Sequence, residues 1–343
     1  MARIALVCEP PDGGVAEHVR QLARGLPAHG HEAVLLGPDV LPFRRDYGHP
    51  HRDVQAFAAL VRAMPRFDLV HAHAAKAGVL ARLAGRARRR PVVYTPHCFP
   101  FAVPDARARR RFGVAVERAL APSTAALVCV CEQERDLAVA NGIRARRLAV
   151  VHNGCPPCPD DVEPELADLA GPVVGAVTVL RRQKRLDVLL AAAPRVLDAV
   201  PEATVVVVGD GPEAAALRGA ADPRVRFVPF RAPAARYLKS LDLYVLPSDW
   251  EAFPIGLLEA QACGVPQVAT DVGGMREALT PETGLIVPPR DPDALAAAVI
   301  SLLRDPHRRA AMSAASRRRH ATHFTVERMV AETAAVYDAV LAS

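Results

Sequence analysis

The stretch from Ala2 to Gly37, ARIALVCEPPDGGVAEHVRQLARGLPAHGHEAVLLG, predicts the fold. Its first run, ARIALVC, is continuously apolar, as expected for a strand that is buried on both faces. The turn PDGG follows, and apolar residues then recur at helical spacing from Val15 to Leu26. The segment HEAVLLG predicts a second strand. A strand, a turn, a helix and a strand in this order open a parallel, doubly wound α/β sheet.

The same alternation fills two blocks of the chain. Residues 1–154 are predicted to form one Rossmann-like domain, and residues 172–325 are predicted to form a second one. Residues 155–171 are rich in proline and acidic residues, lack periodicity and are predicted to be a linker. Residues 326–343 predict a C-terminal helix that is able to pack back on the first domain. We expect the two domains to face a cleft.

Composition excludes several classes of protein. The 343 residues suit two domains, and 51% hydrophobic with 23% charged residues is ordinary for a globular protein. No apolar run approaches the ~18–20 residues of a membrane span, and the segment MARIALVCEPPDGG is interrupted too early for a signal peptide. We therefore expect a cytoplasmic protein.

The seven cysteines predict no metal or redox site. An odd number fits a reducing compartment, in which the thiols stay free. Cys155 and Cys158 form a lone Cys-x-x-Cys, whereas a structural zinc site needs a second pair, and Cys129 and Cys131 would point to opposite faces of a strand. A redox pair normally begins a helix, but proline and acidic residues follow Cys158.

The net charge of +6 comes almost entirely from arginine. Two clusters stand out, at Arg82–Arg90 and Arg107–Arg111. A solvated surface is one interpretation, and contact with an anionic acceptor or a membrane surface, as a weak peripheral attachment, is the other. Neither cluster sits on a clear amphipathic helix with large apolar residues, which favours a soluble acceptor. We expect no nucleic acid partner.

Two strand-to-helix turns have the composition of anion sites. Gly13 and Gly14 would let backbone amides at a helix N-terminus approach an anion, although a tight turn alone also explains them. Arg181, Arg182, Lys184 and Arg185 crowd the first strand-to-helix turn of the second block. Cations at a helix N-terminus oppose the helix dipole, so a bound anion would explain them; a solvated loop is the alternative.

A third turn resembles a dinucleotide fingerprint. Gly209, Gly211 and Ala214 fit the loose Gly-x-Gly-x-x-Gly/Ala pattern after a strand. The fingerprint also requires an acidic residue about 20 positions on, at the end of the next strand. The sequence has Arg231 there, and Pro212 stiffens the loop. An NAD-dependent oxidoreductase therefore remains an alternative that rests on this turn alone.

The fourth turn, DWEAFPIGLLEAQACGVP from Asp249 to Pro266, carries two glutamates. The amides at the start of its helix suit a phosphate. Glu259, expected in the first helical turn, could accept hydrogen bonds from vicinal hydroxyls, and Glu251 on the approaching loop could bind another hydroxylated group. Spacing alone leaves unrelated surface charges as the alternative.

This turn, within VLPSDWEAFPIGLLEAQACGVPQVATDVGGMREAL, resembles the signature of the retaining nucleotide-sugar glycosyltransferases of family four, which have the two-domain GT-B fold. Similar segments occur in order along nearly the whole chain: PDGGVAEHV, DLVHAHAAKAG, VVYTPHCFP, VVHNG, LRRQKRLDVLL, VVGDGP and TGLIVPPRDPDALAAAV. So many ordered matches are far more specific than any one of them.

The resemblance implies that residues 1–154 form the acceptor-side domain and residues 172–325 the nucleotide-sugar-binding domain. It also implies a role for each matching residue. Glu259 would bind the donor ribose, Glu251 the hydroxyls of the donor sugar, and Lys184 the diphosphate. The arginine usually found five positions before that lysine is Val179 here, so Arg181 or Arg182 would supply the second charge. The other implied positions are Gly13, Gly14, Ala252, Phe253, Ile255, Gly256 and Leu257 on the donor, His97 near the transferring sugar and His73 on the acceptor side.

The implied reaction moves a sugar from a nucleoside-diphosphate sugar, with UDP preferred, to a hydroxyl of a small-molecule or glycan acceptor. It needs no metal and no cofactor besides the donor, because Lys184, an arginine and backbone amides would stabilise the leaving diphosphate. A non-catalytic sugar-nucleotide binding protein stays open, since the arginine expected at Val179 is missing.

Overall fold

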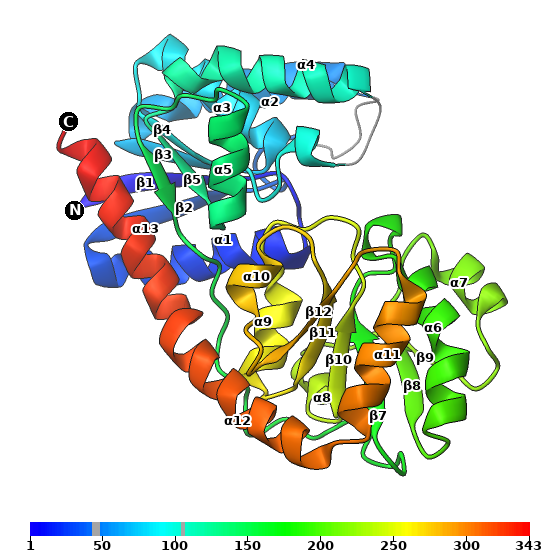
Figure 1. Ribbon diagram of the computed structural model, residues 1–343. Helices are drawn as coiled ribbons and strands as arrows, with labels where there is room; N and C mark the ends of the chain where they lie inside the picture. Colours follow the sequence, from blue (N-terminus) through cyan, green and yellow to red (C-terminus); the bar gives the residue numbers. More distant parts are fainter. Residues whose placement is uncertain (43–48, 104–106) are drawn as a thin grey trace. The chain divides into compact units, whose positions relative to one another are not determined.

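The computed structural model describes residues 1–42, 49–103 and 107–343, which fall into two compact units (Figure 1). Unit 1 comprises Met1–Gly154 and Val326–Ser343, and unit 2 comprises Cys155–Thr325. The 155–171 segment carries no named helix or strand and is part of unit 2. Among the described residues, no helix is at once long and apolar enough to cross a membrane.

Unit 1 is built on a six-stranded parallel sheet of order β2-β1-β3-β4-β5-β6. Its strands are β1 (Ala2–Cys8), β2 (His31–Leu36), β3 (Leu69–His73), β4 (Val92–Thr95), β5 (Ala126–Cys129) and β6 (Leu148–Val150). Its α-helices are α1 (Gly13–Gly25), α2 (Pro50–Ala63), α3 (Ala75–Arg88), α4 (Arg107–Leu120), α5 (Glu132–Ala140) and α13 (Val326–Leu341). Short 3-10 turns are η1 (Leu26–His29), η2 (Met64–Arg66), η3 (Pro100–Ala102) and η4 (Ala121–Ser123).

Helices cover both faces of this sheet because its central strands are apolar on both sides. In β1, Ile4 and Leu6 pack with α1 and α13, whereas Ala5 and Val7 pack with α2 and α3. All four are fully buried. The continuous apolar run at the start of the sequence therefore corresponds to a strand with two buried faces.

The C-terminal helix α13 belongs to the core of unit 1. Met329, Val330 and Tyr337 are almost completely buried there. A Cβ added to Gly25 of α1 would lie 2.7 Å from a methyl group of Val330. The side chain of Val330 therefore packs directly on the backbone of α1 at this glycine. Figure 1 shows α13 beside α1, and both helices pack on the same face of the sheet.

Unit 2 has a second parallel sheet, of order β12-β11-β10-β7-β8-β9. Its strands are β7 (Val173–Val177), β8 (Thr204–Val208), β9 (Arg226–Val228), β10 (Leu243–Leu246), β11 (Gln267–Thr270) and β12 (Gly284–Val287). Its helices are α6 (Leu186–Ala199), α7 (Ala214–Ala220), α8 (Ala235–Leu238), α9 (Ile255–Ala262), α10 (Met275–Ala278), α11 (Pro292–Leu303) and α12 (Pro306–His323), with the 3-10 turn η5 (Arg182–Lys184).

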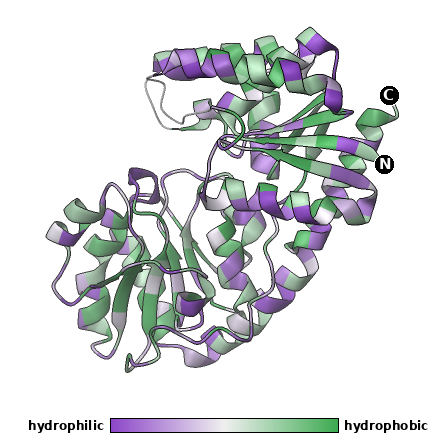
Figure 2. Ribbon diagram, turned by 180° about the vertical axis from the view of Figure 1, so that it is seen from behind, coloured by the Kyte–Doolittle hydropathy of each residue, from purple (hydrophilic) through white to green (hydrophobic). Residues whose placement is uncertain are grey.

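The predicted fold class is confirmed: both units are doubly wound parallel α/β sheets. Counted from its own first strand, unit 2 has the order 3-2-1-4-5-6 of a dinucleotide-binding fold, and the order reverses between β7 and β10. Its strands are dominated by valine and leucine, and Figure 2 shows them as hydrophobic bands between helices with polar outer residues.

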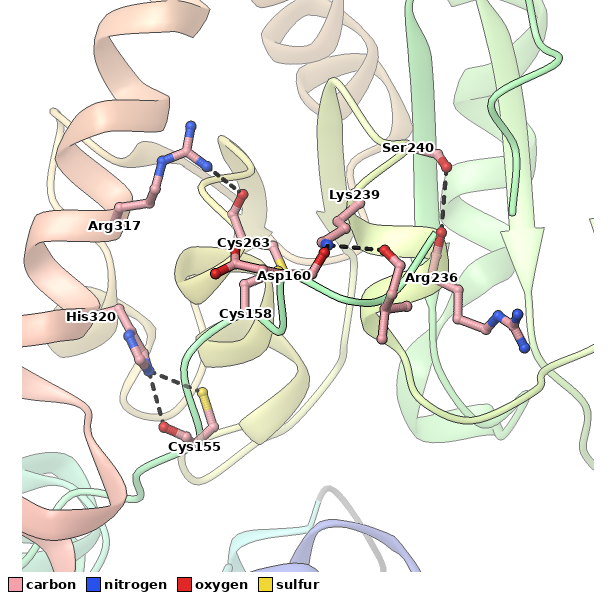
Figure 3. The surroundings of a disulfide bond; sticks show 10 residues. Cys155, Cys158, Asp160, Arg236, Lys239, Ser240, Cys263, Arg317 and His320 are labelled. Carbon is pink, nitrogen blue, oxygen red and sulfur yellow. Dashed lines mark hydrogen bonds between the residues drawn. A yellow bond between two sulfur atoms is a disulfide. The ribbon is translucent and has the colours of Figure 1, made fainter. Parts of the chain in front are cut away.

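The prediction that every thiol stays free was wrong for one pair. Cys158 forms a disulfide with Cys263, which follows α9 directly, and their Cα atoms are 4.8 Å apart (Figure 3). The two cysteines are 105 residues apart in sequence, so spacing could not reveal the pairing. Cys155 is buried instead, with its Sγ 3.3 Å from Nε2 of His320. The Cys-x-x-Cys pair is therefore no shared metal or redox site.

The surroundings of the two arginine clusters differ from those that the sequence predicted. Arg82 is only 1% exposed, because α3 turns it inward. Its guanidinium donates two hydrogen bonds to Glu117 of α4, at 2.7 and 3.1 Å. Arg107–Arg111 opens α4, an amphipathic helix, and Phe112 beside it is 71% exposed. The prediction that neither arginine cluster lies on an amphipathic helix was therefore wrong for Arg107–Arg111.

Candidate active site

Strand order places the charged turns of unit 2 next to each other. Strands β7 and β10 pair directly at the point where the order reverses, and ligands of doubly wound sheets bind beyond the carboxyl ends of strands at that point. The turn after β7 carries Lys184, and the loop after β10 carries Glu251. Two segments 67 residues apart in sequence therefore meet.

Glu251 is the centre of a compact polar cluster. Its Oε1 accepts a hydrogen bond from Nζ of Lys184 at 2.6 Å and one from Oγ of Ser248 at 2.8 Å. The side chains of Glu251 and Lys184 are 8% and 18% exposed. Screening by water is therefore reduced, and the ion pair is stronger than one at an open surface.

The two segments are also joined by backbone contacts. The amide of Asp249 donates to the carbonyl of Gln183 at 2.9 Å, and Nε2 of Gln183 donates to the carbonyl of Trp250 at 2.8 Å. Thr270, at the end of β11, donates through its hydroxyl to the carbonyl of Ser248 at 2.6 Å. The positions of Lys184 and Glu251 are thus fixed by the backbone around them.

Asp249 forms a second ion-pair network that the sequence analysis did not identify. Arg290 donates two hydrogen bonds to its carboxylate, at 2.7 and 2.8 Å, and Nη1 of Arg185 lies 3.3 Å from it. The Arg290 hydrogen bonds lower the pKa of Asp249 despite its burial. Arg185 also pairs with Asp187 and adopts a positive φ of 47°. Part of the positive charge near Lys184 is thus neutralised within the protein.

Gly273 is a further residue that sequence reasoning missed. Its φ is +56°, and an added Cβ would lie 2.1 Å from the carbonyl oxygen of Glu251. The next amide, of Gly274, donates to the carbonyl of Ala252 at 2.8 Å. The glycine pair in DVGGM, directly after a predicted strand, was the available signal for a close approach of two backbones.

We predict that Gly273→Ala destabilises unit 2 and displaces the Glu251 loop. A positive φ costs an alanine about 1–2 kcal/mol, and the backbone clash adds roughly 1–3 kcal/mol. Trp250 is the only tryptophan of the chain, so its fluorescence during urea unfolding reports this region. The control is Gly264→Ala, which has a similar φ of +72° but meets the movable guanidinium of Arg317. Equal losses in the two variants would contradict the clash.

The helix α9 begins at Ile255, and its N-cap residue, Pro254, has no polar side chain to cap the first amides. Its first amides have no partner within the helix and can bind an anion. Glu259 is half-buried one residue beyond the first turn, so its predicted place in that turn was one residue off. Of the other donor-side candidates, Ala252, Phe253 and Leu257 are buried, and Gly256 is half-buried.

The structure places the two candidate arginines differently. Arg181 is half-buried directly before η5, whereas Arg182 lies within this turn and is exposed. Val179, where the resemblance would place an arginine, is 42% exposed in the loop between β7 and η5.

The Gly209–Gly211 turn has a structural explanation. Added Cβ atoms would lie 1.9 Å from the carbonyl oxygen of Thr178 and 2.5 Å from that of Leu180. Glycine is therefore required where the loop after β8 touches the loop after β7. Strand β9 ends at Val228, and Arg231 lies beyond it, 3.6 Å from Glu165.

The candidate residues of unit 1 also gather at a switch point, between β1 and β3. Gly13 opens α1 with a φ of +80° and open space where a Cβ would be, and Gly14 follows it. His73 ends β3, and His97 follows β4. Nδ1 of His73 and Nε2 of His97 are 3.1 Å apart. Sequence reasoning had paired no other histidine with them, yet His18 of α1 lies against both rings.

His97 is held in an uncommon backbone conformation. Its φ is +54° and that of Cys98 is +101°. The amide of Cys98 donates to Glu134 at 2.7 Å, and the amide of Val130 donates to the same carboxyl group at 2.9 Å. Burial lowers the pKa of His97 well below its usual range and raises the pKa of Glu134 to about 7.

We predict that Glu134 makes the stability of unit 1 depend on pH. Its pKa is higher in the folded chain than in the unfolded one, so the folded state retains the proton as the pH rises from 4.5 to about 7. The stabilisation is complete below this window and is lost above it. Relative to Glu134→Gln, the wild type should lose up to about 3 kcal/mol across the window.

Urea unfolding of both proteins at a series of pH values measures this difference. Glu163→Gln, which removes an exposed carboxyl group of unit 2, is the control and should follow the wild type. A constant difference between wild type and Glu134→Gln at every pH would contradict the prediction.

Comparison with known proteins agrees with this architecture. Residues 13–154 match the domain described as glycosyl transferase 4-like, and residues 171–305 match the family of glycosyl transferases group 1. The D-inositol 3-phosphate glycosyltransferase of Jonesia denitrificans is 31% identical over 310 residues, which cover 79% of this chain and 72% of that protein. The chain belongs to the group 1 glycosyltransferases of family four.

Two further proteins show what this group 1 glycosyltransferase is similar to. A GDP-mannose-dependent monoacylated alpha-(1-6)-phosphatidylinositol monomannoside mannosyltransferase of Corynebacterium glutamicum is 39% identical over 158 residues, 43% of this chain and 42% of that protein. Anabaena HepE, solved in complex with UDP, superposes with a TM-score of 0.79 at 20% identity, covering 98% of this chain and 100% of HepE. The chain spans less than two thirds of the length of several curated relatives.

Proposed function

We propose that this chain is a retaining glycosyltransferase that moves a sugar from a nucleoside-diphosphate sugar to a hydroxyl of a small-molecule or glycan acceptor. The main support is the cluster of Lys184, Glu251 and Ser248 at the switch point of unit 2, next to the uncapped start of α9. UDP is the preferred nucleotide of the proposal, as in the HepE complex, and GDP is the alternative, as in the Corynebacterium relative.

The chemistry of the proposal rests on charge. Departure of the nucleoside diphosphate leaves negative charge that Lys184, Arg181 or Arg182 and the first amides of α9 would stabilise. Glu251 would accept hydrogen bonds from the sugar hydroxyls, and Glu259 from the ribose. Before the donor arrives, Glu251 neutralises the ammonium group of Lys184 and holds it in position. Preorganised charge of this kind costs little reorganisation during the reaction.

We assign acceptor recognition to unit 1. In this proposal His97 would act near the transferring sugar, His73 would line the acceptor side, and the amides that follow Gly13 and Gly14 would bind the donor phosphates. Burial lowers the pKa values of both histidines, so each imidazole is neutral near pH 7 and can accept or donate a hydrogen bond.

Binding of nucleoside diphosphates tests the donor assignment. Thermal unfolding is measured with UDP, GDP, dTDP and NAD, each with and without magnesium, and Trp250 next to Glu251 supplies the signal. A ligand at 100 times its dissociation constant stabilises by about 2.7 kcal/mol, a shift of several degrees. A magnesium-independent shift with one nucleoside diphosphate supports the proposal, whereas a shift with NAD alone contradicts it.

The nature of the acceptor is tested at α4. A recess on this helix is lined by Arg107, Arg110, Arg111, Val114, Ala115, Arg118 and Asn141. These arginines and the exposed Phe112 give the helix a cationic and apolar surface that suits an anionic membrane. We propose a weak peripheral contact there. Co-sedimentation with phosphatidylglycerol vesicles at ~0.15 M salt, lost in Arg110→Glu/Arg111→Glu, supports a lipid-linked acceptor. Absence of co-sedimentation favours a soluble one.

The proposal also places the enzyme in the cytoplasm and assigns it no cofactor besides the donor. Glutathione keeps cytoplasmic thiols reduced, so Cys158 and Cys263 should then be thiols in the cell and form their disulfide after extraction. Alkylation during lysis, followed by peptide mass spectrometry, measures their state. A disulfide that is already present at lysis would contradict the cytoplasmic location.

A further inference from the structure

The histidines at the switch point of unit 1 have the geometry of a metal site. Among the described residues, His18, His73 and His97 each offer one ring nitrogen, and these three nitrogens all lie within 4.8 Å of one another. They come from α1, the end of β3 and the loop after β4. Three imidazoles that converge from separate elements form the ligand set of an open zinc-type site.

We propose that His18, His73 and His97 bind one divalent transition-metal ion of the zinc class, and that this ion inhibits sugar transfer.

The separation of two of the three nitrogens fits this class of ion. Two nitrogens at ~2.0–2.1 Å from a tetrahedral zinc lie roughly 3.3 Å apart. Nδ1 of His73 and Nε2 of His97 are already 3.1 Å apart. The ion would replace the proton that these two nitrogens share. Calcium and magnesium are excluded as occupants because they require oxygen ligands, whereas imidazole suits zinc, cobalt, nickel and copper.

The cluster also contains an unused nitrogen. Among the described residues, Nδ1 of His18 is buried without a hydrogen-bond partner and supplies the third ligand. Nε2 of His73 is also buried without a partner, but it is not a ligand when Nδ1 of the same ring binds the ion. Neighbouring His71 is different, because its Nδ1 lies 2.6 Å from the hydroxyl of Tyr337 and its Nε2 lies 2.8 Å from that of Thr95. His71 is therefore not a ligand, although its ring lies against that of His73 at a tilt of 40°, with centroids 3.9 Å apart.

Access also favours binding. His97 is the partly exposed member and offers a path for the ion. The loop that carries His97 is fixed by the hydrogen bond that the amide of Cys98 donates to Glu134. Three protein ligands leave a fourth position for water or an anion.

Inhibition follows from the role of His97 and rests on the proposed function, whereas metal binding does not. An ion on Nε2 of His97, the nitrogen that lies 3.1 Å from Nδ1 of His73, would hold the ring within the histidine cluster and hinder its proposed role near the transferring sugar. Metal binding and its effect on transfer therefore need separate measurements.

Cobalt(II) is the probe for binding. The protein is prepared without an affinity tag and freed of metal with a chelator. It is then titrated with Co²⁺. We expect the visible d–d bands of tetrahedral cobalt to saturate at one equivalent, without the near-ultraviolet band of a thiolate ligand, and to disappear on adding Zn²⁺. His18→Gln and His97→Gln should each weaken binding by at least about 100-fold, the upper end of the loss seen for outer-shell residues.

His31→Gln is the control, because His31 is also a buried histidine of unit 1 but lies outside the cluster. It should retain the affinity of the wild type, and far-ultraviolet circular dichroism confirms that each variant is folded. Loss of the bands in His31→Gln, their persistence in both cluster variants, or a thiolate band would overturn the site.

Transfer is then assayed with chelator and with Zn²⁺. If cobalt binds as expected and sugar transfer is slower in Zn²⁺, both parts of the proposal are supported. Cobalt binding with unchanged transfer overturns the inhibition and leaves the metal site standing. If no nucleotide sugar is turned over under any condition, the proposed function fails, and the cobalt spectra still decide the site.

Discussion

Replacing Lys184 with alanine should lower the rate of sugar transfer by about 10- to 150-fold. A hydrogen bond to a charged group contributes roughly 1.5–3 kcal/mol, which corresponds to that range when it is lost from the transition state. The variant also leaves the carboxylate of Glu251, 8% exposed, without its cationic partner. We therefore expect weaker donor binding and slower turnover together.

The experiment measures kcat and KM for the donor at saturating acceptor. Lys239→Ala is the matched control, since Lys239 also lies in unit 2 but donates to the carbonyl oxygens of Asp160 and Val162. It removes the same charge and should leave transfer unchanged. Glu251→Ala should reduce transfer as well. Unchanged transfer in both Lys184→Ala and Glu251→Ala would show that this cluster is not the donor site.

Replacing Arg82 with leucine should destabilise unit 1 by about 3–5 kcal/mol. Removing one partner of a buried ion pair leaves the other charged in a poorly solvated place. Here Glu117 would remain, 2% exposed, with the hydroxyl of Tyr94 at 3.3 Å as its other partner. The guanidinium also donates to the carbonyl of Gly78 at 2.9 Å and lies 4.1 Å from the centre of the Tyr94 ring.

Hydrogen exchange of the amides in α3 and α4 measures this loss directly, and thermal unfolding should show a midpoint lower by roughly 6–20 °C. Arg86→Leu, an exposed change on the same helix, is the control. The double variant Arg82→Leu/Glu117→Leu should recover most of the stability, because replacing both charges leaves neither unpaired. A double variant as unstable as Arg82→Leu would contradict this explanation and indicate lost packing instead.

The sequence by itself determined the elements and the family. Buried parallel strands are runs of β-branched and aliphatic residues, and their helices have apolar residues at a period of 3.6. Both patterns are local, so ARIALVC, TVVVV and the helices between strands could be predicted from windows of a few residues. The loop from Asp249 to Pro266 carries a signature that is likewise contiguous, which is why the resemblance could identify it.

Tertiary structure alone decided which residues meet. Strand order brings Lys184 to Glu251 across 67 residues, and it brings His18 to His73 and His97 at the other switch point. Periodicity shows which face of an element is buried but not which element covers it. Arg82 therefore looked like part of a surface cluster, although it lies on an inward face opposite Glu117.

The pairing of Cys158 with Cys263 was hidden for the same reason, because 105 residues separate them. A local sequence pattern shows which residues form a helix or a strand. These contacts depend instead on how strands far apart in the sequence pair, and that pairing is decided by the whole sheet. The sequence thus specified the two sheets and the candidate donor loop, and the fold decided the partners of each charged, histidine and cysteine side chain.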